Sequence, residues 1–169
     1  MKRLFFALEV SDLNKNAIAQ WVEIAIPCLK APVKTDNFHL TLSFLGSITP
    51  EVEQILISEL INLKTEVINL VFNNIGYFKK PKVLYLKPEK TPQALYLLVQ
   101  QFNKMVLDAG LSINYFNYQP HITIARKVTE LPTVKFPLDL KIVFTHIVLY
   151  QSISSSSGVK YIKLKSWPL

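Results

Sequence analysis

Two short motifs hold the residues of this chain that are best suited to chemistry, His39-x-Thr41 and His121-x-Thr123. In both motifs the residues between and after the polar ones are apolar, and this strict alternation predicts half-buried β-strands. Successive side chains of a strand point to opposite faces, so the histidine and threonine of each motif share one face. We expect Ser43 to continue the polar face of the first strand.

A pair of histidines suits acid–base chemistry on a phosphodiester. Imidazole has a pKa of about 6.5, so one ring can be neutral and accept a proton while the other is cationic and donates one. Attack on a phosphodiester needs both steps, because the nucleophile loses a proton as the leaving oxygen gains one. The Thr41 and Thr123 hydroxyls can bind a phosphate oxygen. Arg126 could add charge, although strand alternation turns it away from His121 unless the strand bends or ends there.

Other chemistries have less support in the sequence. A zinc site needs three or four ligands, and two histidines without nearby acidic or cysteine residues are too few. The chain has no glycine-rich phosphate loop and no GxSxG motif. Cys28 falls on the predicted apolar stripe of a helix, which argues against a cysteine nucleophile. The third histidine, His146, has no threonine two residues later, and we interpret it as structural.

The elements that must position the motifs occur twice in the chain. The first set is a strand over 3–10, a helix capped by Ser11, and the strand that carries His39. The second is a strand over 82–88, a helix that begins at Thr91-Pro92, and the strand over 119–126 that carries His121. The two sets lie about 80 residues apart, which indicates an internal duplication. Such a duplication predicts an α+β fold of two pseudo-symmetric lobes, with both histidines lining the cleft between them.

Apolar residues at helical spacing predict the buried faces of three helices. The predicted stripes are Leu13, Ala17, Trp21, Ile24 and Cys28 in the first helix, Val52, Ile55, Leu56, Leu60 and Leu63 in the helix that starts at Thr49-Pro50, and Leu95, Leu98, Val99, Phe102, Met105 and Val106 in the third, which should end at Gly110. The remaining segments predict a strand over 67–78, a long strand over 140–154, a serine-rich turn over 154–157 with Gly158, and a last strand over 159–167.

Composition limits the class of protein. The 169 residues fit one domain, spanning 1–169, and half of them are hydrophobic. The balance of 19 basic against 12 acidic residues favours a phosphate-bearing partner such as nucleic acid, although such a charge also serves solubility alone. One cysteine excludes an internal disulfide and suits a reducing cytosol. No apolar run approaches the roughly 18 residues of a membrane span, so we expect a soluble, cytoplasmic protein.

Two groups of lysines have an open interpretation. They are Lys79, Lys80 and Lys82, near the aromatic residues Tyr77, Phe78 and Tyr85, and Lys160, Lys163 and Lys165. They could bind an RNA end by phosphate contacts and stacking. They could equally be solvated strand edges that prevent aggregation.

The motifs and their surroundings resemble the two-histidine phosphoesterase superfamily, and within it the RNA 2′,3′-cyclic phosphodiesterase family, also described as 2′-5′ RNA ligase-like. That superfamily has two H-x-T-x motifs, here "HLTL" at 39–42 and "HITI" at 121–124. The similarity extends to "RLFFAL", "FLG", "KPKVLYL", "AR" and "IVLYQS", and so covers essentially the whole chain. One departure is Ser43, where many relatives have arginine, which leaves fewer charges for the cleft.

The resemblance implies a fold and an activity. The fold would have two lobes, each a mainly antiparallel sheet with helices on the outside. The enzyme would open RNA or nucleotide 2′,3′-cyclic phosphates to 2′-phosphates, with His39 as proton donor and His121 as proton acceptor, and the same site could join RNA ends in reverse. Thr41, Thr123 and Arg126 would hold the phosphate. We expect no cofactor, metal or membrane partner, and a monomer. The alternative is a non-catalytic module that binds an RNA end or nucleotide.

Overall fold

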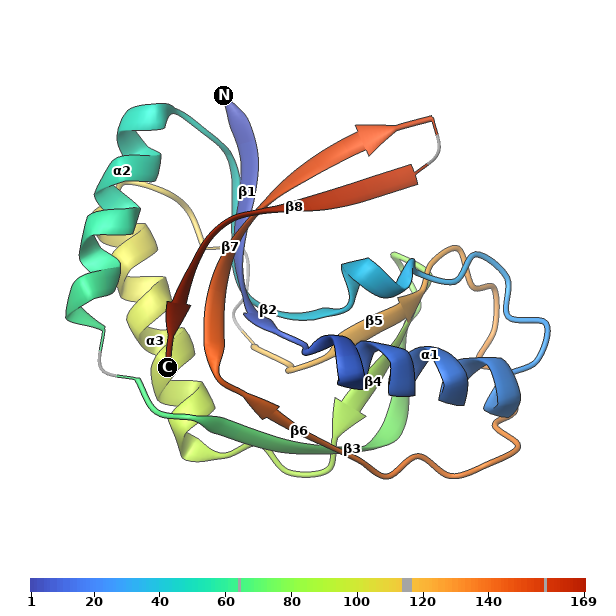
Figure 1. Ribbon diagram of the computed structural model, residues 1–169. Coiled ribbons are helices and arrows are strands. Elements are labelled where there is room, and N and C mark those ends of the chain that lie inside the picture. Colours follow the sequence, from blue (N-terminus) through green and yellow to red (C-terminus); the bar gives the residue numbers. More distant parts are fainter. Residues whose placement is uncertain (64, 114–116, 157) are drawn as a thin grey trace.

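The structure is a computed structural model that describes residues 1–63, 65–113, 117–156 and 158–169 (Figure 1). Its strands and α-helices follow one another as β1 (Lys2–Glu9), α1 (Asp12–Ala25), β2 (His39–Ile48), α2 (Pro50–Glu59), β3 (Ile68–Phe78), β4 (Val83–Pro88), α3 (Gln93–Asp108), β5 (Ile122–Ala125), β6 (Leu140–Phe144), β7 (His146–Ser155) and β8 (Gly158–Pro168). Two short 3₁₀ turns, η1 (Thr35–Asn37) and η2 (Leu60–Asn62), precede β2 and β3.

The strands form one antiparallel sheet in the order β6-β3-β4-β5-β2-β1-β7-β8. This order divides into two halves of four strands, β6-β3-β4-β5 and β2-β1-β7-β8. In each half the strand that carries a His-x-Thr motif lies innermost, β5 in one half and β2 in the other. Its neighbour, β4 or β1, is the strand that comes before the preceding helix in the chain. The α+β class and the antiparallel lobes predicted from the sequence are therefore confirmed, and the two lobes are halves of a single curled sheet.

The halves meet through a very short contact between β2 and β5. Leu40 pairs with Ile122, and both side chains are fully buried. Farther along β5 the segment before η1 replaces β2 as the neighbour, because the Val33 amide donates to the Ile124 carbonyl and Pro32 forms a bridge with Ala125. The separation of β2 from β5 beyond this point opens space between the two halves.

Each half of the sheet is covered by a helix that follows a strand of the other half. Helix α3 follows β4, yet its Phe102 ring packs on Phe6 of β1 with centroids 5.0 Å apart. Helix α1 follows β1, yet its Trp21 donates to the Pro137 carbonyl in the connection from β5 to β6. In Figure 1, α2 and α3 lie together at one end of the molecule and α1 lies at the other. The crossed helices hold the two halves together from outside.

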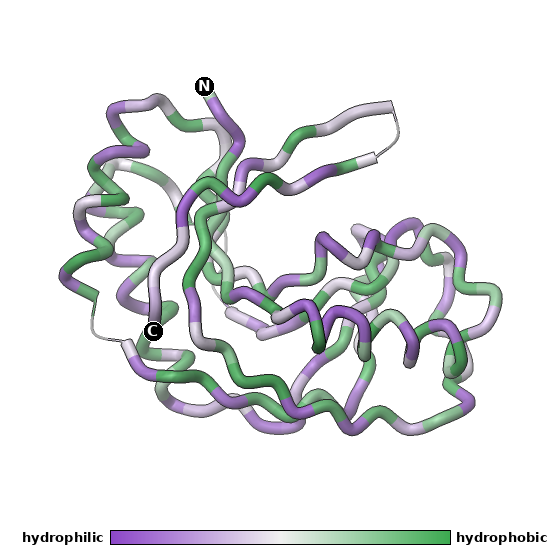
Figure 2. Tube along the Cα trace, viewed as in Figure 1, coloured by the Kyte–Doolittle hydropathy of each residue, from purple (hydrophilic) through white to green (hydrophobic). Residues whose placement is uncertain are grey.

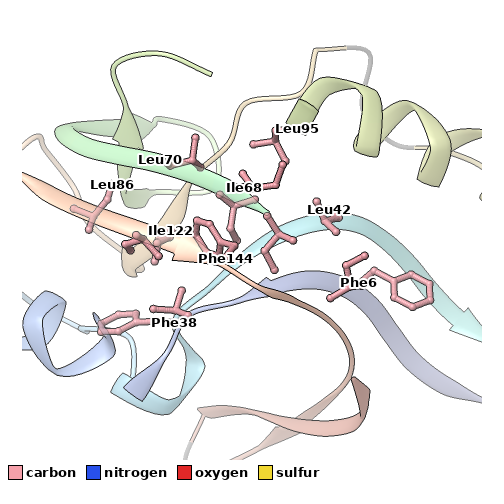
Figure 3. Packing of buried hydrophobic residues seen from close by; sticks show 14 of the residues in the cluster. Phe6, Phe38, Leu42, Ile68, Leu70, Leu86, Leu95, Ile122 and Phe144 are labelled. Carbon is pink, nitrogen blue, oxygen red and sulfur yellow. The ribbon is translucent and has the colours of Figure 1, made fainter. Parts of the chain in front are cut away.

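One large core fills the space between the sheet and the helices. Buried side chains of β1 to β7, α1, α2 and α3 belong to a single cluster, and Figure 3 shows members from several of these elements together, among them Phe6, Ile122 and Phe144. The opposite face of the sheet carries a small second cluster made of Phe5, Ala7, Val148 and Tyr150. Because both faces of β1 are covered, its residues from Leu4 to Leu8 are all buried, and Figure 2 shows this strand as hydrophobic beyond its first residues.

The helix starts follow the predicted signals in two of three cases. The Ser11 side chain accepts from the Asn14 amide, and Thr49 accepts from the Val52 amide with Pro50 in the first turn. The third expectation is wrong, because Pro92 rather than Thr91 is the N-cap of α3 and no side chain caps it.

The predicted apolar stripes differ in their outcome. All six stripe residues of α3 are buried, and Gly110 ends that helix with a positive φ. The stripe predicted for α1 is largely wrong, since its buried residues are Ile18, Val22 and Ala25, although the predicted Trp21 does pack against the core. Leu13 and Ile24 are exposed instead, at 80% and 60%. Helix α1 is apolar enough on several faces that spacing alone did not select the face that packs.

The segment predicted as one long strand over 140–154 is two strands. It breaks at Thr145 between β6 and β7, which belong to different halves of the sheet. The break lets one stretch of chain cross from one half to the other. The serine-rich turn joins β7 to β8, and its Ser157 lies outside the described residues. Among the helices that the structure describes, none is both long and apolar enough to cross a membrane.

The crossed packing of α3 predicts a large effect of Phe102. Phe102→Ala should lower the free energy of unfolding by about 3–5 kcal/mol, because it removes a fully buried ring that contacts Phe6. The matched control is Leu107→Ala on the exposed side of the same helix, which should cost about 0.5 kcal/mol or less. Urea unfolding of the three proteins measures both values, and similar losses in the two variants would contradict this packing.

Candidate active site

A cavity of about 490 Å³ lies where the two halves of the sheet separate, and all five side chains predicted to act in the site line it. They are His39 and Thr41 from β2, His121 directly before β5, Thr123 within β5, and Arg126 just beyond its end. The rest of the lining is largely apolar or aromatic and is made of Leu42, Phe44, Phe78, Pro81, Val83, Asn117, Tyr118 and Gln119. The volume lies within the range of about 300–1,000 Å³ that is usual for small-molecule sites.

The short contact between β2 and β5 explains why the two motifs meet. Leu40 pairs with Ile122 and both side chains enter the core, so the residues before and after each of them point to the opposite face. Because the strands are antiparallel, His39 comes beside Thr123, and both residues also line a hollow next to Asn37, which agrees with this. The two histidines are thus diagonal neighbours, and such neighbours lie about 7–8 Å apart, which leaves room for a phosphate between the rings.

A β-bulge brings Arg126 to the cavity. Leu84 of β4 pairs with Ala125 and Tyr85 pairs with Thr123, so Ile124 is an extra residue in β5. An extra residue reverses the alternation of side chains beyond it. Arg126 therefore lies on the face of Thr123, where simple alternation from the motif would have placed it on the other.

A bulge at the corresponding place in β2 has a different result. Thr41 pairs with Ala7 and Ser43 pairs with Phe6, so Leu42 is the extra residue. Ser43 is consequently buried on the side of Phe6, away from the cavity, and Phe44 occupies the cleft. The expectation that Ser43 continues the polar face is wrong for this reason.

Backbone carbonyls set the tautomer of both histidines. His39 Nδ1 lies 2.6 Å from the Asn37 carbonyl oxygen, and His121 Nδ1 lies 2.7 Å from that of Gln119. A carbonyl oxygen only accepts, so Nδ1 carries hydrogen in both rings and donates it. The neutral rings then have their free lone pair on Nε2. In His39 this atom lies 3.0 Å from Thr41 Oγ1, whose hydroxyl donates to it.

Aromatic rings surround both histidines. The Phe5 and Tyr161 rings have centroids 4.9 Å and 5.0 Å from that of His39, and Tyr150 lies at 6.1 Å. The walls formed by these rings exclude water from one side of His39.

The rings around His121 depend on a glycine. Phe78 and Tyr85 stack on each other at 4.2 Å, and each meets His121 edge-on at 5.3 Å and 5.2 Å. A Cβ at Gly76 would lie 2.3 Å from the Tyr85 ring, so the tyrosine can occupy this place only because residue 76 has no side chain. Gly76 therefore acts on the position of His121 through Tyr85.

Burial lowers the pKa of both imidazoles. Loss of contact with water brings the pKa of His39 from its ordinary 6.5 to about 4, although its hydrogen bond to the Asn37 carbonyl acts in the opposite direction. The charges of His121 and Arg126 lower the His39 pKa further. The pKa of His121 is also lowered, chiefly by burial and to a smaller extent by Arg126, against the effect of the Gln119 carbonyl. Both rings are therefore neutral at pH 7 in the protein without substrate.

Sequence reasoning missed the residues that hold the motifs in place. Asn37 and Gln119 orient the two imidazoles through their backbone carbonyls. Every residue has such a carbonyl, so no side-chain signal marks these two positions for this role. Tyr118 lines the cavity and its hydroxyl donates to the Thr41 carbonyl at 2.9 Å, which links the approach to β5 with β2. A tyrosine three residues before His121 was visible in the sequence, but its partner in β2 was not.

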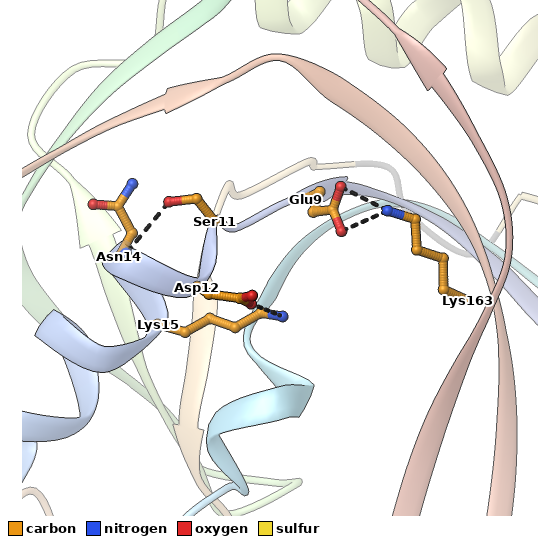
Figure 4. A network of polar contacts seen from close by, with 6 residues as sticks. All are labelled: Glu9, Ser11, Asp12, Asn14, Lys15 and Lys163. Carbon is orange, nitrogen blue, oxygen red and sulfur yellow. Dashed lines mark hydrogen bonds and ion pairs between the residues drawn. The ribbon is translucent and has the colours of Figure 1, made fainter.

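The remaining candidate residues lie elsewhere. Cys28 is exposed beyond the end of α1 and not on an apolar stripe, which corrects the prediction. His146 is exposed at the start of β7 and contacts Thr145. Lys163 binds both Glu9 carboxylate oxygens, at 2.8 Å and 2.9 Å (Figure 4), so this lysine serves a structural contact between β8 and β1. Across the described residues, no three His, Cys, Asp or Glu side chains gather as a metal site would require.

Comparison with known proteins identifies the family of the chain and several similar proteins. The family model named AKAP7 2'5' RNA ligase-like domain matches residues 10–155. A protein of Escherichia coli K12 named RNA 2',3'-cyclic phosphodiesterase is 28% identical over 99% of this chain and 97% of its own length, and one of the same name from Methanocaldococcus jannaschii is 28% identical over 98% and 99%. The crystal structure of E. coli LigT complexed with 3'-AMP matches with a TM-score of 0.91 at 27% identity, over 99% of this chain and 98% of the other.

The lowered pKa values predict that acid destabilises the protein through its histidines. Below pH 6.5 the unfolded chain binds protons that the folded protein does not, so stability is lost as the pH falls toward about 4, where His39 also protonates in the folded state. His39→Gln should therefore lose less unfolding free energy between pH 7 and pH 4.5 than the unaltered protein. Urea unfolding at the two pH values measures this, with His146→Gln as the matched control, and an unchanged pH dependence in His39→Gln would contradict the lowered pKa.

Proposed function

Because the chain belongs to the family of the AKAP7 2'5' RNA ligase-like domain, we propose that it is an enzyme that hydrolyses RNA or nucleotide 2′,3′-cyclic phosphates to 2′-phosphates. The observation that carries this proposal is the pair of imidazoles in one cavity, each oriented through Nδ1 by a backbone carbonyl, so that Nε2 is the acid–base atom of both rings. The names of the curated relatives support the same reaction, and the 3'-AMP in the E. coli LigT crystal structure supports a nucleotide as ligand.

The proposed reaction needs one proton acceptor and one proton donor. A water molecule attacks phosphorus and gives a proton to Nε2 of neutral His121. The bond from phosphorus to the 3′ oxygen breaks as that oxygen takes a proton from Nε2 of cationic His39. The product carries a 2′-phosphate and a 3′-hydroxyl, and the two rings return to their first protonation states through solvent. Strain in the five-membered ester ring reduces what the protein must supply.

The phosphate would be held by groups of both halves of the sheet. The Thr41 and Thr123 hydroxyls can donate to non-bridging oxygens, and the Arg126 guanidinium offers two parallel donors and a positive charge. No step of this scheme assigns a role to a metal or a cofactor. The aromatic lining, which includes Phe44 and Phe78, suits the base and ribose of a terminal nucleotide.

The negative charge of a bound substrate would change the pKa of both histidines. A phosphodiester anion between the rings raises the pKa of an imidazole, because it favours the cationic form. Binding therefore promotes the proton on His39 that the leaving oxygen requires. The imidazolium would keep its hydrogen bond to the Asn37 carbonyl, which also favours the charged ring.

Two further activities are compatible with the same site. If the 5′-hydroxyl of a second RNA end attacks phosphorus in place of water, the bond to the 3′ oxygen breaks in the same way and the two ends are joined in a 2′-5′ linkage, which agrees with the name of the family. A non-catalytic module that binds an RNA end would use the same phosphate contacts, but it has no need of two titratable rings in one tautomer. Turnover separates the enzyme from the binding module. A cytoplasmic monomer that acts on RNA ends fits the proposal.

Removal of either histidine should abolish most of the turnover. His39→Ala and His121→Ala should each lower kcat by about 10²–10⁴, the usual contribution of a positioned acid or base. The assay supplies the four nucleoside 2′,3′-cyclic phosphates and identifies the product isomer by chromatography. His146→Ala removes an exposed imidazole outside the cavity and should retain full activity. Absence of turnover by the unaltered protein, or full activity of His39→Ala, would overturn the proposal.

The pH profile of the unaltered enzyme should reveal both lowered pKa values. The profile of kcat/KM reports the free enzyme and should be a bell with both limbs below pH 6.5, because burial lowers the pKa of His39 and of His121. The profile of kcat reports the complex and should lie at higher pH, because the bound anion raises the pKa of both rings. Initial rates between pH 4 and pH 9 measure the two profiles, and a kcat/KM maximum above pH 7 would contradict this account.

A further inference from the structure

A second cavity of about 420 Å³ adjoins the proposed active site on the same face of the sheet. The chain contains only two arginines, Arg3 and Arg126, and both line this cavity. Its other polar residues are Ser152 and Ser154 of β7 and Tyr161 of β8. Two guanidinium groups and three hydroxyls are all hydrogen-bond donors, and none of the lining residues is acidic. This composition suits a phosphate.

Neither arginine of this cavity takes part in an ion pair with another residue that the structure describes. The ion pairs among the described residues join Lys2 to Glu53, Lys15 to Asp12, Lys104 to Asp108 and Lys163 to Glu9, so neither arginine takes part in one. Both arginines are exposed to solvent. A guanidinium group without a carboxylate partner can bind an incoming phosphate without first breaking an ion pair.

The second cavity begins where the first ends. Arg126 lines both. Phe5 and Tyr161 line the second cavity, and their rings pack against His39 with centroids 4.9 Å and 5.0 Å away. A ligand whose terminal phosphate lies between the two histidines can therefore extend past Arg126 into the second cavity.

Hydrogen bonds join β8, which forms one wall of the second cavity, to the η1 turn that precedes His39. The Asn37 side-chain amide donates to the Val159 carbonyl at 2.8 Å, and its oxygen accepts from the Tyr161 amide at 3.3 Å. The carbonyl of this same Asn37 holds His39 Nδ1. The polar groups of the second cavity are thus held in a defined place relative to the proposed proton donor.

On the basis of the proposed function, we propose that this cavity binds the phosphodiester that precedes the terminal nucleotide of an RNA substrate, with Arg3 as the cation that belongs to this cavity alone and Arg126 shared between the two phosphates. The enzyme would then act on the 3′ end of a chain in preference to a free cyclic mononucleotide. Bidentate arginine contacts to phosphate read the backbone and not the base, so the preference for length should not depend on sequence.

Kinetics with two substrates of different length test this proposal. We expect kcat/KM for a dinucleotide with a 2′,3′-cyclic phosphate end to exceed that for the matching mononucleotide by about tenfold or more, chiefly through KM. Arg3→Gln should remove most of this advantage and change mononucleotide turnover less than about twofold. Arg3→Lys keeps the charge without the bidentate geometry and should retain part of the advantage.

A charge-matched control and the possible outcomes complete the design. Lys141→Gln removes one exposed positive charge from β6, at the other edge of the sheet, and should preserve the dinucleotide advantage. Equal kcat/KM for the two substrates, or an equal loss for both in Arg3→Gln, would overturn the second phosphate site and leave the proposed function intact. Absence of turnover on either substrate would instead be a failure of the proposed function.

Discussion

The pairing of Leu40 with Ile122 is the contact on which the rest of this structure depends. It joins the two halves of the sheet, and both side chains belong to the core under the helices. Because strand neighbours alternate, burial of these two residues turns the polar residues on either side of them to the opposite face. The hydrophobic contact that holds the halves together is therefore also what brings His39 and His121 into one cavity.

The two halves repeat the same order of strands but not the same chemistry. Each His-x-Thr strand has a bulge directly after the threonine, and each bulge turns the residue three positions after that threonine toward the cleft. That residue is Phe44 in β2 and Arg126 in β5. The two bulges thus bring an aromatic side chain from one half and a cationic side chain from the other to the same cavity, which suits the flat base and the charged phosphate of a nucleotide.

Opposing effects act on the two imidazoles. Burial among aromatic rings disfavours their cationic forms, whereas the backbone carbonyls at Asn37 and Gln119 favour them. Burial is the stronger effect in the protein alone, so both rings are neutral there at pH 7. The negative charge of a bound phosphate acts in the same direction as the two carbonyls and raises the pKa of both imidazoles. A carbonyl acceptor also orients each ring without adding a carboxylate, which would repel the substrate.

The sequence by itself determined the motifs, the order of elements, the α+β class and the buried face of α3, because period-two and helical spacing are local properties. Local pattern failed where packing partners decide. The exposed Leu13 of α1, the burial of Ser43 and the arrival of Arg126 in the cleft depend on which helix face meets the sheet and where two bulges interrupt the alternation. A bulge is defined by the neighbouring strand, so only the tertiary structure could decide on which face those residues lie.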